Sequence, residues 1–209
     1  MGSKYIIFDL GGVLLDIHYK ATEDAFRSLE LKAPEKAFTK YHQSDLFQNF
    51  EKGLITDQAF IGKLKELMPK ATEKDLQKAW CAMLGDLIDG RIELLEKLKS
   101  TGVPLYLLSN TNGIHQVAFE ESIDATYGWE RFEACFNGIY YSHRMGLRKP
   151  DPSIFREVMG REGLKAEAGL FIDDTIDHVL GARSCGMKAI HIEEPDELEK
   201  VIKLEGFIL

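Results

Sequence analysis

The chain has 209 residues, of which 44% are hydrophobic and 29% are charged, and its net charge at pH 7 is −8. These values are typical of a globular protein with one good core, and the acidic balance argues against a general nucleic-acid binder, which needs a basic surface. The longest apolar runs have the length of a strand, far below the roughly 20 residues of a membrane span, so we predict no transmembrane segment and no membrane partner.

The cysteines and the first residues indicate a compartment. Cys81, Cys135 and Cys185 are odd in number and widely spaced among apolar or helix-forming residues, which favours reduced thiols. Residues 1–4 lead directly into an apolar run, without the extended apolar stretch and cleavage site of a signal peptide. We therefore expect a cytoplasmic protein.

The first predicted element, residues 5–9, is a short apolar run ending in the acid Asp9, which is typical of a buried strand and opens into a turn at Gly11 and Gly12. Residues 19–89 then show helical patterns only, with Thr56 and Thr72 as helix starts. We interpret residues 18–90 as a compact helical insert.

From residue 91 onward, predicted helices and strands alternate. Helices are expected over 91–100, from about 112, over 152–162, over 175–185 and from 195, and strands over 104–109, 138–142, 169–172 and 188–192. This alternation predicts an α/β fold, with a doubly wound, Rossmann-like parallel sheet built from residues 1–17 and 91–209. Because parallel strands end on one edge of such a sheet, the polar residues after each strand should meet there and form a ligand site.

Four polar clusters follow the predicted strand ends: Asp9-Leu10-Gly11-Gly12, Ser109-Asn110-Thr111-Asn112, Arg148-Lys149-Pro150-Asp151 and Asp173-Asp174. Each alone has an ordinary explanation, as a turn, a helix cap or a solvated lysine. In this order around an α/β pattern, they resemble the four signature motifs of the haloacid dehalogenase superfamily. The longer strings around them look like the branch that contains bacterial sugar 1-phosphate phosphatases and the N-terminal phosphatase domain of soluble epoxide hydrolases. Residues 18–90 lie where that family inserts its helical cap.

The first cluster would supply the nucleophile. The Asp9 carboxylate can form an aspartyl-phosphate, which divides hydrolysis into two steps. A carboxylate that approaches a phosphate dianion is repelled, so a hard cation with oxygen ligands is needed between them. The resemblance implies Mg²⁺ held by Asp9, the backbone carbonyl of Gly11 and Asp174, with Asp173 just outside the direct ligands.

The remaining motif residues would hold the phosphate. Ser109 can donate its hydroxyl to a phosphoryl oxygen, and Lys149 can neutralise one negative charge. The other expected phosphate-binding residues are Leu10 and Gly11, through the tight glycine turn, and Asn110. We expect Asp177, one helical turn after Asp174, to orient Lys149 or a metal-bound water.

One position departs from the family pattern. Most phosphatases of this superfamily carry a second aspartate two residues after the nucleophile, which protonates the leaving oxygen, and Gly11 stands there in this chain. Asp16, His18 or a cap residue could replace it. Without this acid, which contributes typically 10²- to 10⁴-fold, we expect a preference for good leaving groups such as an anomeric phosphate. Further candidates for substrate contact are Tyr19, His42, Phe47 and His115.

The sequence therefore predicts a Mg²⁺-dependent phosphatase of a small phosphorylated metabolite, a sugar phosphate by preference, acting as a monomer or homodimer. Two alternatives stay open. A metal-free haloacid dehalogenase would commonly carry an aromatic residue at the position of Gly11 and would not need the acid pair at Asp173 and Asp174. A non-catalytic binding protein could retain the scaffold after losing the acid at position 11, since function resides in sites rather than in folds.

Overall fold

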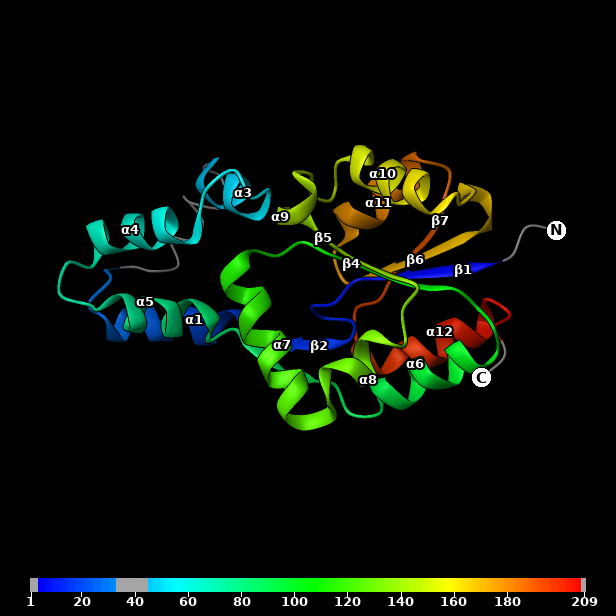
Figure 1. Ribbon diagram of the computed structural model, residues 1–209, viewed down its shortest axis with the longest axis horizontal. Helices are drawn as coiled ribbons and strands as arrows, with labels where there is room; N and C mark the ends of the chain where they lie inside the picture. The colour runs from blue at the N-terminus through cyan, green and yellow to red at the C-terminus, as the bar shows by residue number, and fades with distance from the viewer. Residues whose placement is uncertain (1–3, 33–44, 208–209) are drawn as a thin grey trace.

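The computed structural model describes residues 4–32 and 45–207. Its centre is a five-stranded parallel sheet in the order β5-β4-β1-β6-β7, shown in Figure 1. The strands are β1 (Tyr5–Phe8), β4 (Leu105–Ser109), β5 (Gly138–Tyr141), β6 (Gly169–Asp173) and β7 (Lys188–His191). The strands β1, β4 and β6 are buried along their whole length, because helices cover both faces of a doubly wound sheet.

Two helical layers cover the sheet, as Figure 1 shows. One layer contains α6 (Arg91–Ser100), α7 (Gly113–Tyr127), α8 (Trp129–Glu133) and α12 (Leu198–Leu204), and the other contains α10 (Pro152–Glu162) and α11 (Ile176–Ser184). Successive side chains of β1 alternate between the two layers: Ile6 and Phe8 belong to the first core, and Tyr5 and Ile7 to the second. Residues 5–8 are therefore all apolar because both faces of their strand are buried.

A separate group of helices, which we call the cap, comprises α1 (Tyr19–Ser28), α3 (Asp45–Glu51), α4 (Asp57–Leu67) and α5 (Glu73–Cys81). The cap has its own apolar core, in which the rings of Phe50 and Phe60 stack with centroids 4.0 Å apart. The predicted helix starts are confirmed, since the side chain of Thr56 accepts from Ala59 N and Thr72 forms a capping box with Asp75.

The prediction of helices only over 19–89 is wrong at one place. Residues Leu84–Leu87 form the strand β3, which pairs antiparallel with β2 (Leu15–Ile17). The helix α5 ends at Cys81, so the chain can leave the cap and join this ribbon. The pairing joins segments about 70 residues apart, which is why the local helical pattern did not indicate it. The doubly wound parallel sheet with an inserted helical cap is confirmed.

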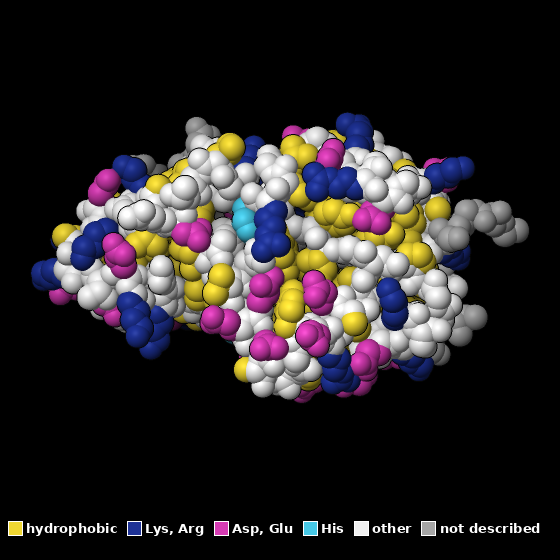
Figure 2. Space-filling view, viewed as in Figure 1, with side chains coloured by type: hydrophobic (Ala, Val, Ile, Leu, Met, Phe, Trp, Pro, Cys, Tyr) yellow, Lys and Arg dark blue, Asp and Glu magenta, His cyan; other side chains and the backbone are white. Residues whose placement is uncertain are grey.

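Three shorter helices connect these elements: α9 (Ser142–Met145) and the 3₁₀ turns η1 (Ala166–Ala168) and η2 (Pro195–Glu197). None of the helices in residues 4–32 and 45–207 combines the length and the apolar character needed to cross a bilayer. On the face drawn in Figure 2, basic and acidic side chains are interspersed over the cap and the sheet domain.

Candidate active site

The carboxyl ends of β1, β4 and β6 open into one cavity of about 440 Å³ between the sheet and the cap. The sheet side of its lining includes Asp9, Ser109, Asn110 and Asp174. Parallel strands end on the same edge, so residues that are 100 and 165 positions from Asp9 in the sequence lie beside it. The structure therefore brings residues of all four sequence clusters to the cavity surface, the remaining cluster through Arg148.

Lys149, of the same cluster as Arg148, lies directly beneath the cavity. Lys149 is completely buried, and its Nζ lies 2.8 Å from Asp9 Oδ1 and 2.7 Å from Asp173 Oδ2. The loop that carries Lys149 is held by Asn110, whose Oδ1 accepts from Lys149 N and whose Nδ2 donates to Lys149 O, both at 2.9 Å. The side chain of Asn110, predicted to bind phosphate, thus positions the lysine in this structure.

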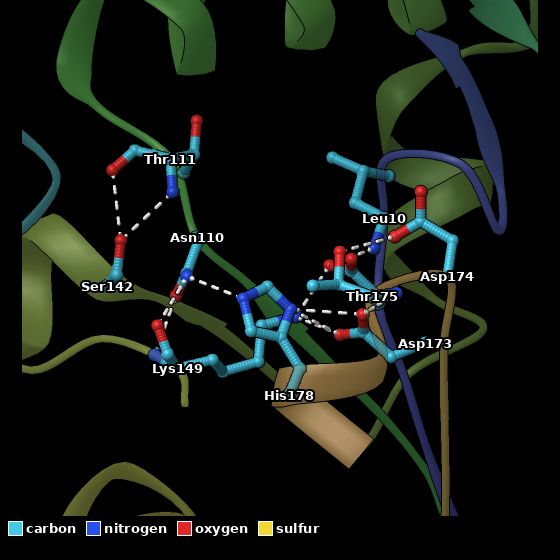
Figure 3. A network of polar contacts seen from close by, with 10 residues as sticks. Leu10, Asn110, Thr111, Ser142, Lys149, Asp173, Asp174, Thr175 and His178 are labelled. Atoms are coloured by element: carbon cyan, nitrogen blue, oxygen red, sulfur yellow. Dashed lines mark hydrogen bonds and ion pairs between the residues drawn. The ribbon is translucent and has the colours of Figure 1, made fainter. Parts of the chain in front are cut away.

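Figure 3 shows how the side chains around Asp173 converge. Besides Lys149, the carboxylate of Asp173 accepts from Thr175 N at 2.8 Å, and His178 Nδ1 lies 3.0 Å from its Oδ1. A carboxylate accepts only, so the Nδ1 of His178 carries the hydrogen. Both oxygens of Asp173 are therefore already engaged by protein groups.

Asp9 is held on one oxygen. Its Oδ1 accepts from Lys149 Nζ and from Leu10 N at 2.7 Å. Its Oδ2 has no protein partner in the described part of the chain, and because Asp9 lines the cavity, this oxygen is available to a ligand. The nucleophile is thus oriented while one of its oxygens remains open.

Asp174 approaches Asp9 because of a glycine. Gly12 has a φ of +72°, and a Cβ at this residue would lie 2.1 Å from Asp174 Oδ2. Only glycine accepts this backbone conformation at little cost while leaving room for the carboxylate. The Gly-Gly turn after β1 therefore makes space for the acid that follows β6.

The electrostatics of the site show an excess of negative charge. Burial, reinforced by the charge of Asp173, raises the pKa of Asp9 to about 8, and burial with Asp173 also raises the pKa of Asp174. Although burial opposes ionisation of Asp173, the charge of Lys149 and the hydrogen bond from His178 hold its pKa below the usual range. One ammonium therefore balances one carboxylate and leaves two others poorly compensated.

This charge excess fits a divalent cation with a preference for oxygen, such as Mg²⁺. Within the described residues, the ligand-type atoms of Asp9, Asp173 and His178 lie within 4.8 Å of one another. Asp173 and His178 bind each other, however, and Asp173 also binds Lys149. Asp9, Gly11 and Asp174 line the cavity, whereas Asp173 does not, so the first three are better placed to hold a cation there.

The cap covers the other side of the cavity. Of the predicted substrate contacts, Tyr19, Phe47 and His115 line it, and Trp80 lies beside them. His115 stacks on Trp80 with centroids 4.7 Å apart, and its Nε2 lies 3.0 Å from the carbonyl oxygen of Trp80. Burial lowers the pKa of His115 to about 4, so the ring is neutral, donates through Nε2 and keeps Nδ1 as an acceptor.

Four other predicted residues do not reach the cavity in the described structure. Leu15 and Ile17 of β2 line it, so Asp16 between them faces the other way, and His18 lies with Asp16 against Gly85. Asp177 is exposed to solvent, and Asp173 is the residue that binds Lys149. His42 lies outside the described residues.

Sequence reasoning missed His178 and Trp80. The helix that follows Asp174 begins only at Ile176, so helical spacing counted from Asp174 selected Asp177 instead of the neighbouring His178. Trp80 was assigned to the cap core, where it does pack, but its Nε1 also donates to Asn112 Oδ1 at 3.4 Å across the boundary with the sheet domain. No local pattern indicated that second contact.

Comparison with known proteins finds similarity along most of the chain. Residues 4–186 match the family described as haloacid dehalogenase-like hydrolase. A D-ribitol-5-phosphate phosphatase from Bacteroides thetaiotaomicron is 27% identical, over 91% of this chain and 92% of its own length. A sesquiterpene phosphatase from Aspergillus oryzae is 28% identical, over 91% of this chain and 90% of its own length. A solved HAD-family enzyme from Bacteroides thetaiotaomicron, in complex with magnesium and inorganic phosphate, is 30% identical with a TM-score of 0.79, covering 91% of this chain and 94% of that one. These similarities extend over both the sheet and the cap.

Proposed function

The chain belongs to the haloacid dehalogenase-like hydrolase family, and from this premise we propose that it is a Mg²⁺-dependent phosphatase of a small phosphate monoester, with Asp9 as nucleophile. The observation that carries this proposal is the arrangement of Asp9, whose Oδ1 is held by Lys149 and whose Oδ2 is open to the cavity beside Asp174. Relatives named as phosphatases of D-ribitol 5-phosphate and of a sesquiterpene support a phosphomonoester substrate.

The first step transfers the phosphoryl group to the protein. Asp9 Oδ2 attacks phosphorus, a bond forms between them, and the bond from phosphorus to the ester oxygen breaks. The leaving oxygen takes a proton from solvent water and departs as an alcohol. Lys149 favours the ionised form of Asp9 and orients it, and the Ser109 hydroxyl, at the end of β4, donates to a phosphoryl oxygen.

The second step restores the enzyme. Water attacks the phosphorus of the aspartyl-phosphate, the bond to Asp9 Oδ2 breaks, and inorganic phosphate leaves after the attacking water gives up a proton to the solvent. Asp9, Asp174 and the Gly11 carbonyl would hold Mg²⁺, whose charge would offset the repulsion between carboxylate and phosphate.

The substrate class follows from the leaving group and the cavity. Gly11 offers no carboxyl to protonate the leaving oxygen, so we expect sugar phosphates with a good leaving group, such as an anomeric phosphate, to react fastest. The cavity, at about 440 Å³, is within the range of small-molecule sites.

Hydrolysis of a panel of small phosphate esters tests the function. The panel includes glucose 1-phosphate, sugar phosphates with a primary ester and an aryl phosphate, each with Mg²⁺ and with chelator. We expect turnover that requires Mg²⁺ and is abolished in Asp9→Asn while the melting temperature shows a folded protein. Turnover that persists in chelator on a 2-haloacid would indicate the dehalogenase instead, and a protein with neither activity nor a covalent phosphoryl intermediate would be a binding protein.

We also propose a cytoplasmic location. Cys81, Cys135 and Cys185 are free thiols, and burial raises the pKa of Cys81 and of Cys135 to about 11. Thiols of this kind are typical of proteins in a reducing compartment. Fractionation of cells that express the chain with a C-terminal tag tests this location.

A further inference from the structure

An ion pair joins the cap to the sheet domain at the cavity. Glu51, the last residue of α3, accepts from Arg148 Nε at 2.8 Å, and Arg148 directly precedes Lys149 in the chain. Both side chains line the cavity and are about three-quarters buried, with 25% and 23% of their surface exposed. A pair at this depth is less screened by solvent than an ion pair on the open surface.

The backbone around Glu51 is fixed against the sheet domain. Gly53 follows α3 in a turn with a φ of +67°, and a Cβ at this position would lie 2.2 Å from the carbonyl oxygen of His143 in α9. The end of α3 therefore packs on α9 with no space between the two backbones. This contact places the end of α3, and with it Glu51, beside the sheet domain that carries Arg148.

The charges that line the cavity leave no cation for a second anionic group. Among the cavity-lining residues that the structure describes, Arg148 is the only arginine or lysine, and Glu51 neutralises it. Lys149 lies below and is bound by Asp9 and Asp173. Glu23 also lines the cavity and adds negative charge on the cap side.

We propose that Glu51 is a specificity-determining residue, which restricts the substrate to phosphate monoesters whose organic part carries no second anionic group. The proposal rests on the phosphatase function above. A carboxylate or second phosphate on the substrate would face Glu51 and Glu23, and it could bind Arg148 only by displacing Glu51. Once Glu51 is neutral, the guanidinium of Arg148 is free to bind a planar anion through two parallel hydrogen bonds.

A pair of ligands that differ only in this charge tests the proposal. In 3-phosphoglycerate a carboxylate replaces one CH₂OH group of glycerol 3-phosphate. Each is used as a competitive inhibitor of Mg²⁺-dependent aryl phosphate hydrolysis, so the inhibition constant reports affinity even where turnover is slow. We expect the wild type to bind glycerol 3-phosphate at least about tenfold more tightly, and Glu51→Gln to reduce that ratio by about tenfold, an effect of about 1.4 kcal/mol.

Two further variants separate charge from structure. Glu96→Gln makes the same charge change in an ion pair with Arg131 on the surface and should leave the ratio unchanged. Arg148→Gln, added to Glu51→Gln, should remove the gained affinity for 3-phosphoglycerate, because the freed guanidinium is gone. Melting temperatures show whether each variant is folded.

Two results would overturn the proposal. One is a wild type that binds the two ligands equally well. The other is a Glu51→Gln variant in which both inhibition constants change in parallel, which would mean that Glu51 only holds the cap in place. If the wild type has no Mg²⁺-dependent aryl phosphatase activity, the phosphatase function itself fails, and titration calorimetry of the two ligands still decides the role of Glu51.

Discussion

Replacing Gly12 by alanine tests whether Asp174 holds the metal. The new Cβ would lie 2.1 Å from Asp174 Oδ2, so the carboxylate must withdraw by about 1.3 Å to reach the 3.4 Å of an ordinary contact. Mg²⁺ requires ligand oxygens at about 2.0–2.1 Å in a near-ideal octahedron, and a displaced carboxylate cannot meet that requirement. We expect the Mg²⁺ concentration for half-maximal activity to rise at least about 10- to 100-fold.

The left-handed backbone conformation adds a second effect, which a matched control removes. Alanine at a φ of +72° costs about 1–2 kcal/mol of stability. Gly163 has a φ of +63° at the end of α10 and has open space where a Cβ would be, so Gly163→Ala carries the backbone cost without the contact. Both variants should melt a few degrees lower than the wild type, at about 2–4 °C per kcal/mol.

Mg²⁺ activation of aryl phosphate hydrolysis and titration calorimetry with Mg²⁺ are the two measurements. We expect Gly163→Ala to match the wild type in both and Gly12→Ala to fail in both. Equal Mg²⁺ affinity in the two variants would refute the assignment of Asp174 as a metal ligand.

Two other predictions concern buried titratable groups. Lys149→Met leaves Asp9 and Asp173 without their shared cation, so we expect the free energy of unfolding, measured by urea denaturation in chelator, to fall by about 3–5 kcal/mol. Adding Asp173→Asn should restore part of this loss. An unchanged denaturation midpoint in Lys149→Met would contradict the buried ion pair. Burial lowers the pKa of His115 from 6.5 to about 4, so the unfolded chain binds a proton at this ring more readily than the folded chain does. The free energy of unfolding should therefore fall by about 3 kcal/mol as the pH falls from 7 to 4. His115→Gln should lose this part of the pH dependence in denaturant titrations at several pH values, and parallel curves for the two proteins would argue against a buried neutral ring.

The sequence predicted the elements of the fold that are defined by local signals such as helix caps. The observed bounds of α6 and α10 equal the expected ranges 91–100 and 152–162. In α10 the reason is visible: Asp151 caps the first turn, Pro152 begins the helix and Gly163 ends it in a left-handed conformation. The ribbon of β2 and β3 was not predictable in the same way, because each strand is short and depends on a partner far along the chain.

In the candidate site, too, some features were predictable from the sequence and others were not. The meeting of Asp9, Ser109, Lys149 and Asp174 follows from the rule that parallel strands end on one edge, which needs only the order of the elements. The partners of each side chain depend on rotamers and on where a helix begins. Thus the sequence could not assign Lys149 to Asp173, or distinguish His178 from Asp177.

The ribbon of β2 and β3 also has a consequence for how such a protein can change over evolutionary time. Leu15 pairs with Leu87 and Ile17 with Leu84, so the chain leaves the sheet domain and returns to it at neighbouring points. Paired strands lie about 5 Å apart, so any inserted segment whose ends are this close can replace the cap without a new path for the rest of the chain. Lengthening such an insert costs little, because loop closure depends only weakly on length. One continuous stretch of sequence can therefore be exchanged to alter substrate choice, while the residues that transfer the phosphoryl group remain in place.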